Sequence, residues 1–120
     1  MKHLITGGAR SGKSRHAEQC AKDSGKRLIY LATGQAKDEE MAARISLHKN
    51  QRGPQWALIE EPLHIAAQLG KYSSCEYCIV LDCLTLWLSN CLEDDCWATE
   101  KAKFIDTLAQ SQSDIVLVGN

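Results

Sequence analysis

Five short apolar segments, separated by stretches with helical character, restrict what this chain can fold into. They are HLIT, RLIYLAT, WALIE, CIVLDCL and DIVLVGN, at 3–6, 27–33, 56–60, 78–84 and 114–120. Continuous apolar runs of this length are typical of strands buried on both faces of a parallel sheet. Helices are predicted over 13–23, 38–48, 84–92 and 97–110, and one more near Pro62. The alternation predicts an α/β fold with helices on both faces of the sheet.

Composition limits the class of protein. With 120 residues, 44% of them hydrophobic and 24% charged, the chain fits one globular domain. A net charge of -1 gives no bulk attraction to nucleic acid or to an anionic membrane, so a small-molecule substrate is expected and a nucleic-acid partner is not. No apolar run is long enough to span a bilayer, and no signal peptide is recognisable, so a cytoplasmic location is expected.

A glycine-rich loop follows the first predicted strand and precedes the first predicted helix. GGARSGKS, at 7–14, has the spacing G-x-x-x-x-G-K-S. Glycines let successive backbone N–H groups turn toward one phosphate, and the helix N-terminus adds its positive dipole end. Lys13 is expected to reach phosphate oxygens, and Ser14 to ligate Mg²⁺. The alternative is a glycine-rich surface turn with a chance Lys-Ser pair.

A carboxylate ends the strongest predicted central strand. Asp82 closes CIVLD, and ligands gather beyond the carboxyl ends of parallel strands. Asp82 is therefore a candidate second group for Mg²⁺. It could instead cap the following helix, and the two roles are compatible.

One histidine lies among cations. On the predicted helix, Met41, Arg44, Ile45 and His48 share a face, and Lys49 and Arg52 follow. Such a cluster suits a phosphate-rich ligand, and a histidine can attack phosphorus to form a covalent intermediate. The alternative is a solvated histidine at a helix end, where the dipole favours a cation.

The six cysteines are expected to be thiols, because the chain carries no recognisable export signal. Cys75-x-x-Cys78 could indicate a metal or redox site, but no second ligand pair has the usual spacing. Cys78 and Cys83 lie in or beside an apolar strand, where cysteine usually acts as a small hydrophobe.

Four sequence blocks together resemble one enzyme family. ITGGARSGKSRHAE, YLATGQ, DEEMAARI..H and LDCLTLWLSN, in this order and spacing, are similar to the bifunctional adenosylcobinamide kinase / adenosylcobinamide-phosphate guanylyltransferases of cobalamin biosynthesis. The resemblance implies a P-loop NTPase-like (RecA-like) three-layer α/β fold with a mostly parallel central sheet. Residues 1–120 would form a single nucleotide-binding domain, the N-terminal part of the family's domain, with the sheet incomplete at the C-terminus.

The resemblance also implies two linked activities that require Mg²⁺. One phosphorylates adenosylcobinamide with ATP or GTP. The other transfers GMP from GTP to an enzyme histidine and then to adenosylcobinamide phosphate, which gives adenosylcobinamide-GDP. A homo-oligomer, a trimer, is implied as well.

The family's site residues carry over to matching positions. The resemblance assigns the guanylylated histidine to His48, phosphate contact to Lys13 and the metal to Ser14 and Asp82. It assigns nucleotide binding to Gly7, Gly8, Ala9, Arg10, Ser11, Gly12, Lys13, Ser14, Thr33, Gly34, Gln35, Lys49, Asn50, Gln51, Arg52, Glu60 and Asp82.

Two other functions are open. A nucleotide-binding chain without catalytic turnover would keep the loop and lose the transfer reactions. A motor or switch NTPase ranks below it, because no arginine finger or water-orienting glutamine can be assigned from the sequence.

Overall fold

The computed structural model describes residues 1–7, 12–34 and 55–119, and the helix predicted over 38–48 lies outside them. The strands are β1 (Lys2–Thr6), β2 (Arg27–Ala32), β3 (Trp56–Glu60), β4 (Tyr77–Asp82) and β5 (Asp114–Gly119). The helices are α1 (Lys13–Asp23), α3 (Ile65–Lys71), α4 (Leu84–Glu93) and α5 (Trp97–Gln110). The five predicted strands are confirmed, as are the helices predicted over 13–23, 84–92 and 97–110, with ends that differ by two residues at most.

The prediction for the start of α3 is wrong. The helix begins at Ile65 rather than near Pro62. The side chain of Glu61 accepts hydrogen bonds from the backbone N–H groups of Leu63, at 3.2 Å, and His64, at 3.1 Å. These bonds hold the chain in a turn through Pro62, so the helix starts only after the turn is complete.

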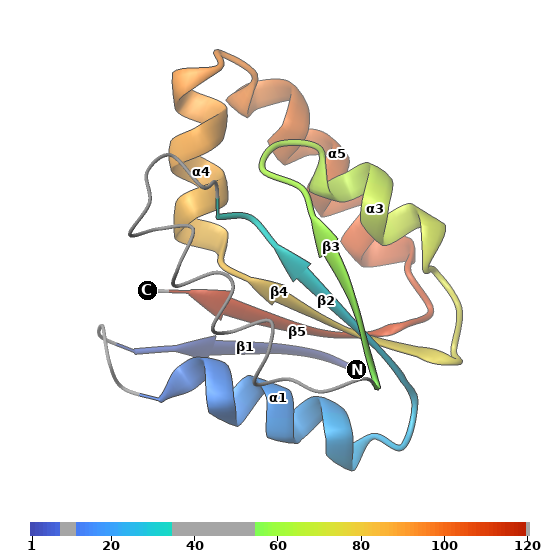
Figure 1. The fold of residues 1–120 in the computed structure, drawn as a ribbon. Helices are drawn as coiled ribbons and strands as arrows, with labels where there is room; N and C mark the ends of the chain where they lie inside the picture. Colours follow the sequence, from blue (N-terminus) through green and yellow to red (C-terminus); the bar gives the residue numbers. More distant parts are fainter. Residues whose placement is uncertain (8–11, 35–54, 120) are drawn as a thin grey trace.

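The described strands form one sheet in the order β1-β5-β4-β2-β3, and every neighbouring pair is parallel. The helix α1 covers one face, and α3, α4 and α5 cover the other (Figure 1). The α/β class, the parallel sheet and the three layers are therefore confirmed. The strand β4, predicted as central, lies in the middle of the order.

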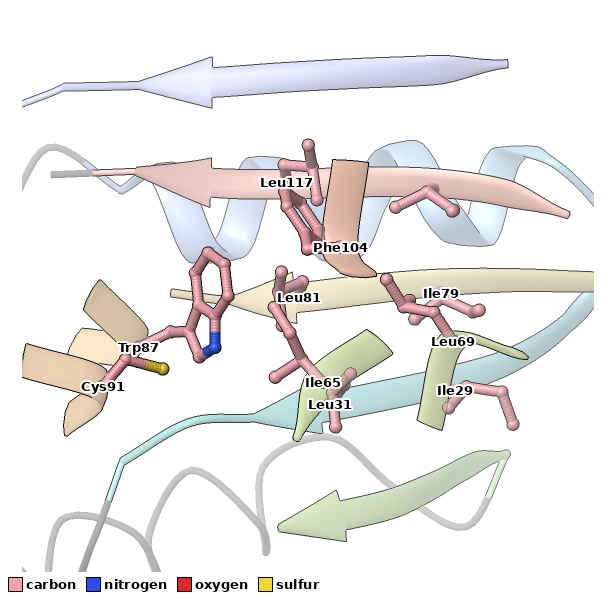
Figure 2. Close-up of a cluster of buried hydrophobic side chains, with 11 residues drawn as sticks. Ile29, Leu31, Ile65, Leu69, Ile79, Leu81, Trp87, Cys91, Phe104 and Leu117 are labelled. Atoms are coloured by element: carbon pink, nitrogen blue, oxygen red, sulfur yellow. The ribbon is translucent and has the colours of Figure 1, made fainter. Parts of the chain in front are cut away.

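Alternate residues of the inner strands fill two separate cores. Leu31, Ile79 and Leu81 pack toward Ile65 of α3, Trp87 of α4 and their neighbours (Figure 2). Their neighbours in sequence face α1, whose buried residues are small, and this second core includes Leu28, Tyr30, Trp56, Cys78, Val80 and Cys83. The prediction that Cys78 and Cys83 act as small apolar side chains is confirmed, since both are buried.

Glycines bound α1 at both ends. Gly12 precedes the helix with φ of 78°, and Gly25 follows it with φ of 69°, both in the left-handed region that favours glycine. Beyond the C-terminal end, the N–H of Gly25 donates to the carbonyl oxygen of Lys22 at 3.2 Å. Among the described helices, none combines the length and apolar character that crossing a membrane requires.

Candidate active site

The parallel register brings the carboxyl ends of the strands to one edge of the sheet. Ala32 pairs with Asp82 on one side and with Glu60 on the other, while Thr6 pairs with Gly119. The segments that follow β1, β2, β3 and β4 therefore all leave from this edge. Ligands of open α/β sheets bind beyond this edge.

The first turn of α1 lies at the same edge. Gly12 is the residue before the helix, and its carbonyl oxygen accepts the N–H of His16 at 3.0 Å. Lys13 and Ser14 are thus the first two helical residues, where backbone N–H groups without an intrahelical partner and the helix dipole favour an anion. Gly7 is also described, whereas Gly8, Ala9, Arg10 and Ser11 lie outside the described residues.

The structure brings Ser14 and Asp82 together. The Ser14 hydroxyl donates to Oδ2 of Asp82 at 2.9 Å, although the two residues lie 68 positions apart. A hydroxyl and a carboxylate side by side provide the hard oxygen donors that Mg²⁺ prefers. Asp82 is the last residue of β4 and α4 begins at Leu84, with no side-chain cap bond at its N-terminus. The pair therefore fits a magnesium site, and the cap interpretation of Asp82 is wrong.

A third residue of this cluster is absent from the sequence predictions. The Tyr30 hydroxyl donates to the same Oδ2 atom of Asp82. Tyr30 lies in the middle of β2 and is buried. The available signal was the segment RLIYLA itself, because a tyrosine inside a buried strand needs a partner for its hydroxyl.

Thr33 connects the ends of β2 and β4. Its hydroxyl donates to the Cys83 carbonyl oxygen at 2.8 Å and accepts from the Cys83 N–H at 2.9 Å. The Thr33 N–H donates to the Asp82 carbonyl oxygen at 3.0 Å, and Asn90 of α4 donates to the Thr33 carbonyl oxygen at 2.9 Å. The Thr33 side chain is fully buried, so it supports the segment that carries Asp82 from within the protein.

Of the other predicted site residues, the structure describes Gly34 and Glu60. Gly34 follows Thr33 and is partly exposed, and Glu60 is exposed at the end of β3. Glu60 lies two strands from Asp82, with Ala32 between them in register. The remaining predicted residues lie outside the described part of the chain; they are Gln35, His48, Lys49, Asn50, Gln51 and Arg52.

The Cys83 thiol beside this site is unsuited to nucleophilic chemistry. Burial raises its pKa, and the nearby Asp82 carboxylate raises it further, against the opposing effects of backbone hydrogen bonds and of the Lys13 charge. A thiol whose pKa is raised above 9.0 stays protonated at neutral pH. The same edge therefore offers hydroxyl and carboxylate oxygens in place of a thiolate.

Several known proteins are similar to this chain in sequence. A family model described as "Cobinamide kinase / cobinamide phosphate guanyltransferase" matches residues 3–120. The bifunctional adenosylcobalamin biosynthesis protein CobP of Pseudomonas aeruginosa is 43% identical over 123 residues, which cover all of this chain and 71% of that protein. The bifunctional adenosylcobalamin biosynthesis proteins CobU of Escherichia coli and Salmonella typhimurium are each 42% identical, over 78% and 77% of this chain. Those matches span about half of each CobU protein, 51% and 50%. The chain belongs to the cobinamide kinase / cobinamide phosphate guanyltransferase family.

Proposed function

We propose that this chain binds nucleoside triphosphate where Ser14 and Asp82 meet, at the edge of the sheet formed by the carboxyl ends of the strands. We propose further that it phosphorylates adenosylcobinamide and transfers GMP from GTP through His48. The observation that carries the proposal is the 2.9 Å hydrogen bond between Ser14 and Asp82 at the N-terminus of α1. Membership of the family supports the two reaction types.

The proposed roles follow from the chemistry of each group. Backbone N–H groups at the start of α1 and the Lys13 ammonium would bind phosphate oxygens. Ser14 would ligate magnesium directly, and Asp82 would hold Ser14 or a metal-bound water. When bound, the magnesium ion neutralises charge on the phosphates.

The guanylyl transfer needs a nucleophile. We assign it to His48, whose neutral imidazole would attack the α-phosphorus of GTP and displace pyrophosphate. Breaking the resulting phosphorus–nitrogen bond would pass GMP to the phosphate of adenosylcobinamide phosphate. Lys49 and Arg52 would stabilise negative charge on the transferring group.

A homo-oligomer remains a prediction, which light scattering on the full chain can check.

The decisive experiment for the transferase step uses GTP labelled at the α-phosphate. We expect label on the wild-type chain and on His3→Ala, a control that removes an exposed histidine of β1. His48→Ala should carry no label, and the bond should be stable to base and labile to acid. Nucleotide binding without label on the wild-type chain would support the alternative of a binding protein without turnover.

The kinase step has a separate test. ADP formation should depend on added adenosylcobinamide, and Lys13→Ala should lower its rate by roughly 100-fold, as expected for loss of one donor to a charged transition state. An equal rate of ADP formation without adenosylcobinamide would contradict the kinase assignment and favour a switch-type NTPase.

A further inference from the structure

The hydroxyl groups of Tyr30 and Ser14 meet on one oxygen atom. Both donate to Oδ2 of Asp82.

The Tyr30 ring is held firmly enough to define where its hydroxyl lies. Its side chain is 2% exposed, and the ring meets Trp56 edge-on, with centroids 5.8 Å apart and planes at 79°. In the sheet register Tyr30 pairs with Val80, so Asp82 is its diagonal neighbour two residues along β4. Residues two apart on a strand point to the same face, so Asp82 lies on the same side of the sheet as Val80 and Tyr30. The hydroxyl therefore reaches Asp82 from a fixed base in the α1-side core.

The Ser14 and Tyr30 hydroxyls have different roles when magnesium and nucleotide bind. A serine hydroxyl that ligates a metal must place its oxygen for the ion, so the geometry of its bond to Asp82 changes with the metal. In the proposed site Tyr30 is not a metal ligand, so its bond to Oδ2 is kept when magnesium binds. A carboxylate held at Oδ2 by Tyr30 keeps one orientation, in which it would accept a hydrogen bond from metal-bound water.

We propose that Tyr30 is a positioning residue that fixes the Asp82 carboxylate for magnesium–nucleotide binding. This inference rests on the proposed function, because it requires that Ser14 and Asp82 serve a magnesium ion. Tyr30 itself does not touch the ion or the nucleotide in this proposal.

The test compares Tyr30→Phe with the wild-type chain by binding of a fluorescent ATP analogue. The substitution removes the hydroxyl and keeps the ring beside Trp56. In EDTA the affinity should stay within about twofold of wild type. The magnesium concentration that gives half of the magnesium-dependent gain in affinity should rise roughly 10-fold. This is the scale on which residues that hydrogen-bond to metal ligands affect metal affinity. Tyr72→Phe is the matched control, because Tyr72 contacts Tyr77 instead, and it should behave as wild type.

The outcomes separate this inference from the proposed function. A wild-type chain whose ATP binding does not respond to magnesium overturns both. A wild-type response together with an unchanged magnesium dependence in Tyr30→Phe overturns the role of Tyr30 alone. Equal weakening of binding with and without magnesium also overturns it, because it shows a general structural effect.

A second measurement uses the wild-type protein and needs no variant. In a chain labelled with ¹³C at the tyrosine ring carbon that bears the hydroxyl, magnesium is added to the nucleotide complex. The Tyr30 resonance should shift, while those of Tyr72 and Tyr77 should not. An unchanged Tyr30 resonance contradicts the proposal even if Tyr30→Phe fails to fold.

Discussion

At the scale of single residues, Thr33 shows how one buried hydroxyl supports the site. Its oxygen both donates to and accepts from the backbone of Cys83, the residue after Asp82. The Thr33 backbone adds bonds to Asp82 and Asn90. These four bonds connect β2, β4 and α4 where Asp82 is presented.

We predict that Thr33→Val lowers the free energy of unfolding by about 1–3 kcal/mol, because the buried N–H and carbonyl of Cys83 lose their side-chain partner. Thr33→Ser keeps the hydroxyl and is expected to lose less. Urea denaturation followed by tryptophan fluorescence measures both. If Thr33→Val, which keeps the methyl group, costs no more than Thr33→Ser, which keeps the hydroxyl, the hydrogen-bond explanation is wrong.

At the scale of elements, the Asp114 carboxylate connects β5 to the residues just before β1 and β2, at the amino end of the sheet. Asp114, the first residue of β5, accepts from the Met1 amino group before β1 at 2.9 Å. It also pairs at 3.0 Å with Lys26, between α1 and β2. Burial alone would raise the pKa of Asp114, but the hydrogen bonds and positive charges of these two partners outweigh it, so the pKa is lowered from 3.8.

This lowered pKa fixes the sign of a pH dependence. A carboxyl that is more acidic in the folded state stabilises the protein above its unfolded pKa, near 3.9, and loses this contribution as the pH falls through the folded pKa. We expect Asp114→Asn to cost about 1 kcal/mol at pH 6–7, a modest value because the Met1 partner is 45% exposed. The difference from wild type should shrink below about pH 4.

Thermal unfolding at a series of pH values checks this expectation. Asp106→Asn is the control, because this exposed residue accepts a hydrogen bond from Gln110 of the same helix, and the effect should stay small at every pH. A cost for Asp114→Asn that stays constant down to pH 2 would contradict the ion-pair explanation.

At the scale of the whole molecule, the two cores share the same strands. The residues of β4 alternate between them, with Val80 toward α1 and Leu81 toward α3, α4 and α5. Both side chains are fully buried. Each layer of helices forms its core only by packing on the shared strands. The two cores should therefore unfold together.

We predict that Leu81→Ala lowers the free energy of unfolding by about 2–5 kcal/mol, since it leaves a cavity in the middle of the sheet. Leu92→Ala, at a side chain that is 60% exposed, should change it by less than about 0.5 kcal/mol. Far-ultraviolet circular dichroism and tryptophan fluorescence should give one midpoint for each variant. Two separate midpoints would show that the cores unfold independently.

Local patterns in the sequence determined the elements and predicted which residues share the candidate site. Apolar runs predicted all five strands, and α1 was predicted from Lys13 to Asp23 because glycine follows its last turn. The G-x-x-x-x-G-K-S spacing and the acidic end of CIVLD indicated that Ser14 and Asp82 would serve one site, since parallel strands end at one edge. Their hydrogen bond agrees with this prediction.

Only the tertiary structure decided which distant residues meet. The order β1-β5-β4-β2-β3 inserts β5 between the strand before the loop and the strand of Asp82. The register of β2 on β4 makes Tyr30 a partner of Asp82 and Thr33 a partner of Cys83, across 52 and 50 positions of sequence. Strand order and register depend on how every helix and strand packs at once, because a shift by one residue would turn each buried side chain to the other face. No short stretch of the chain contains that information.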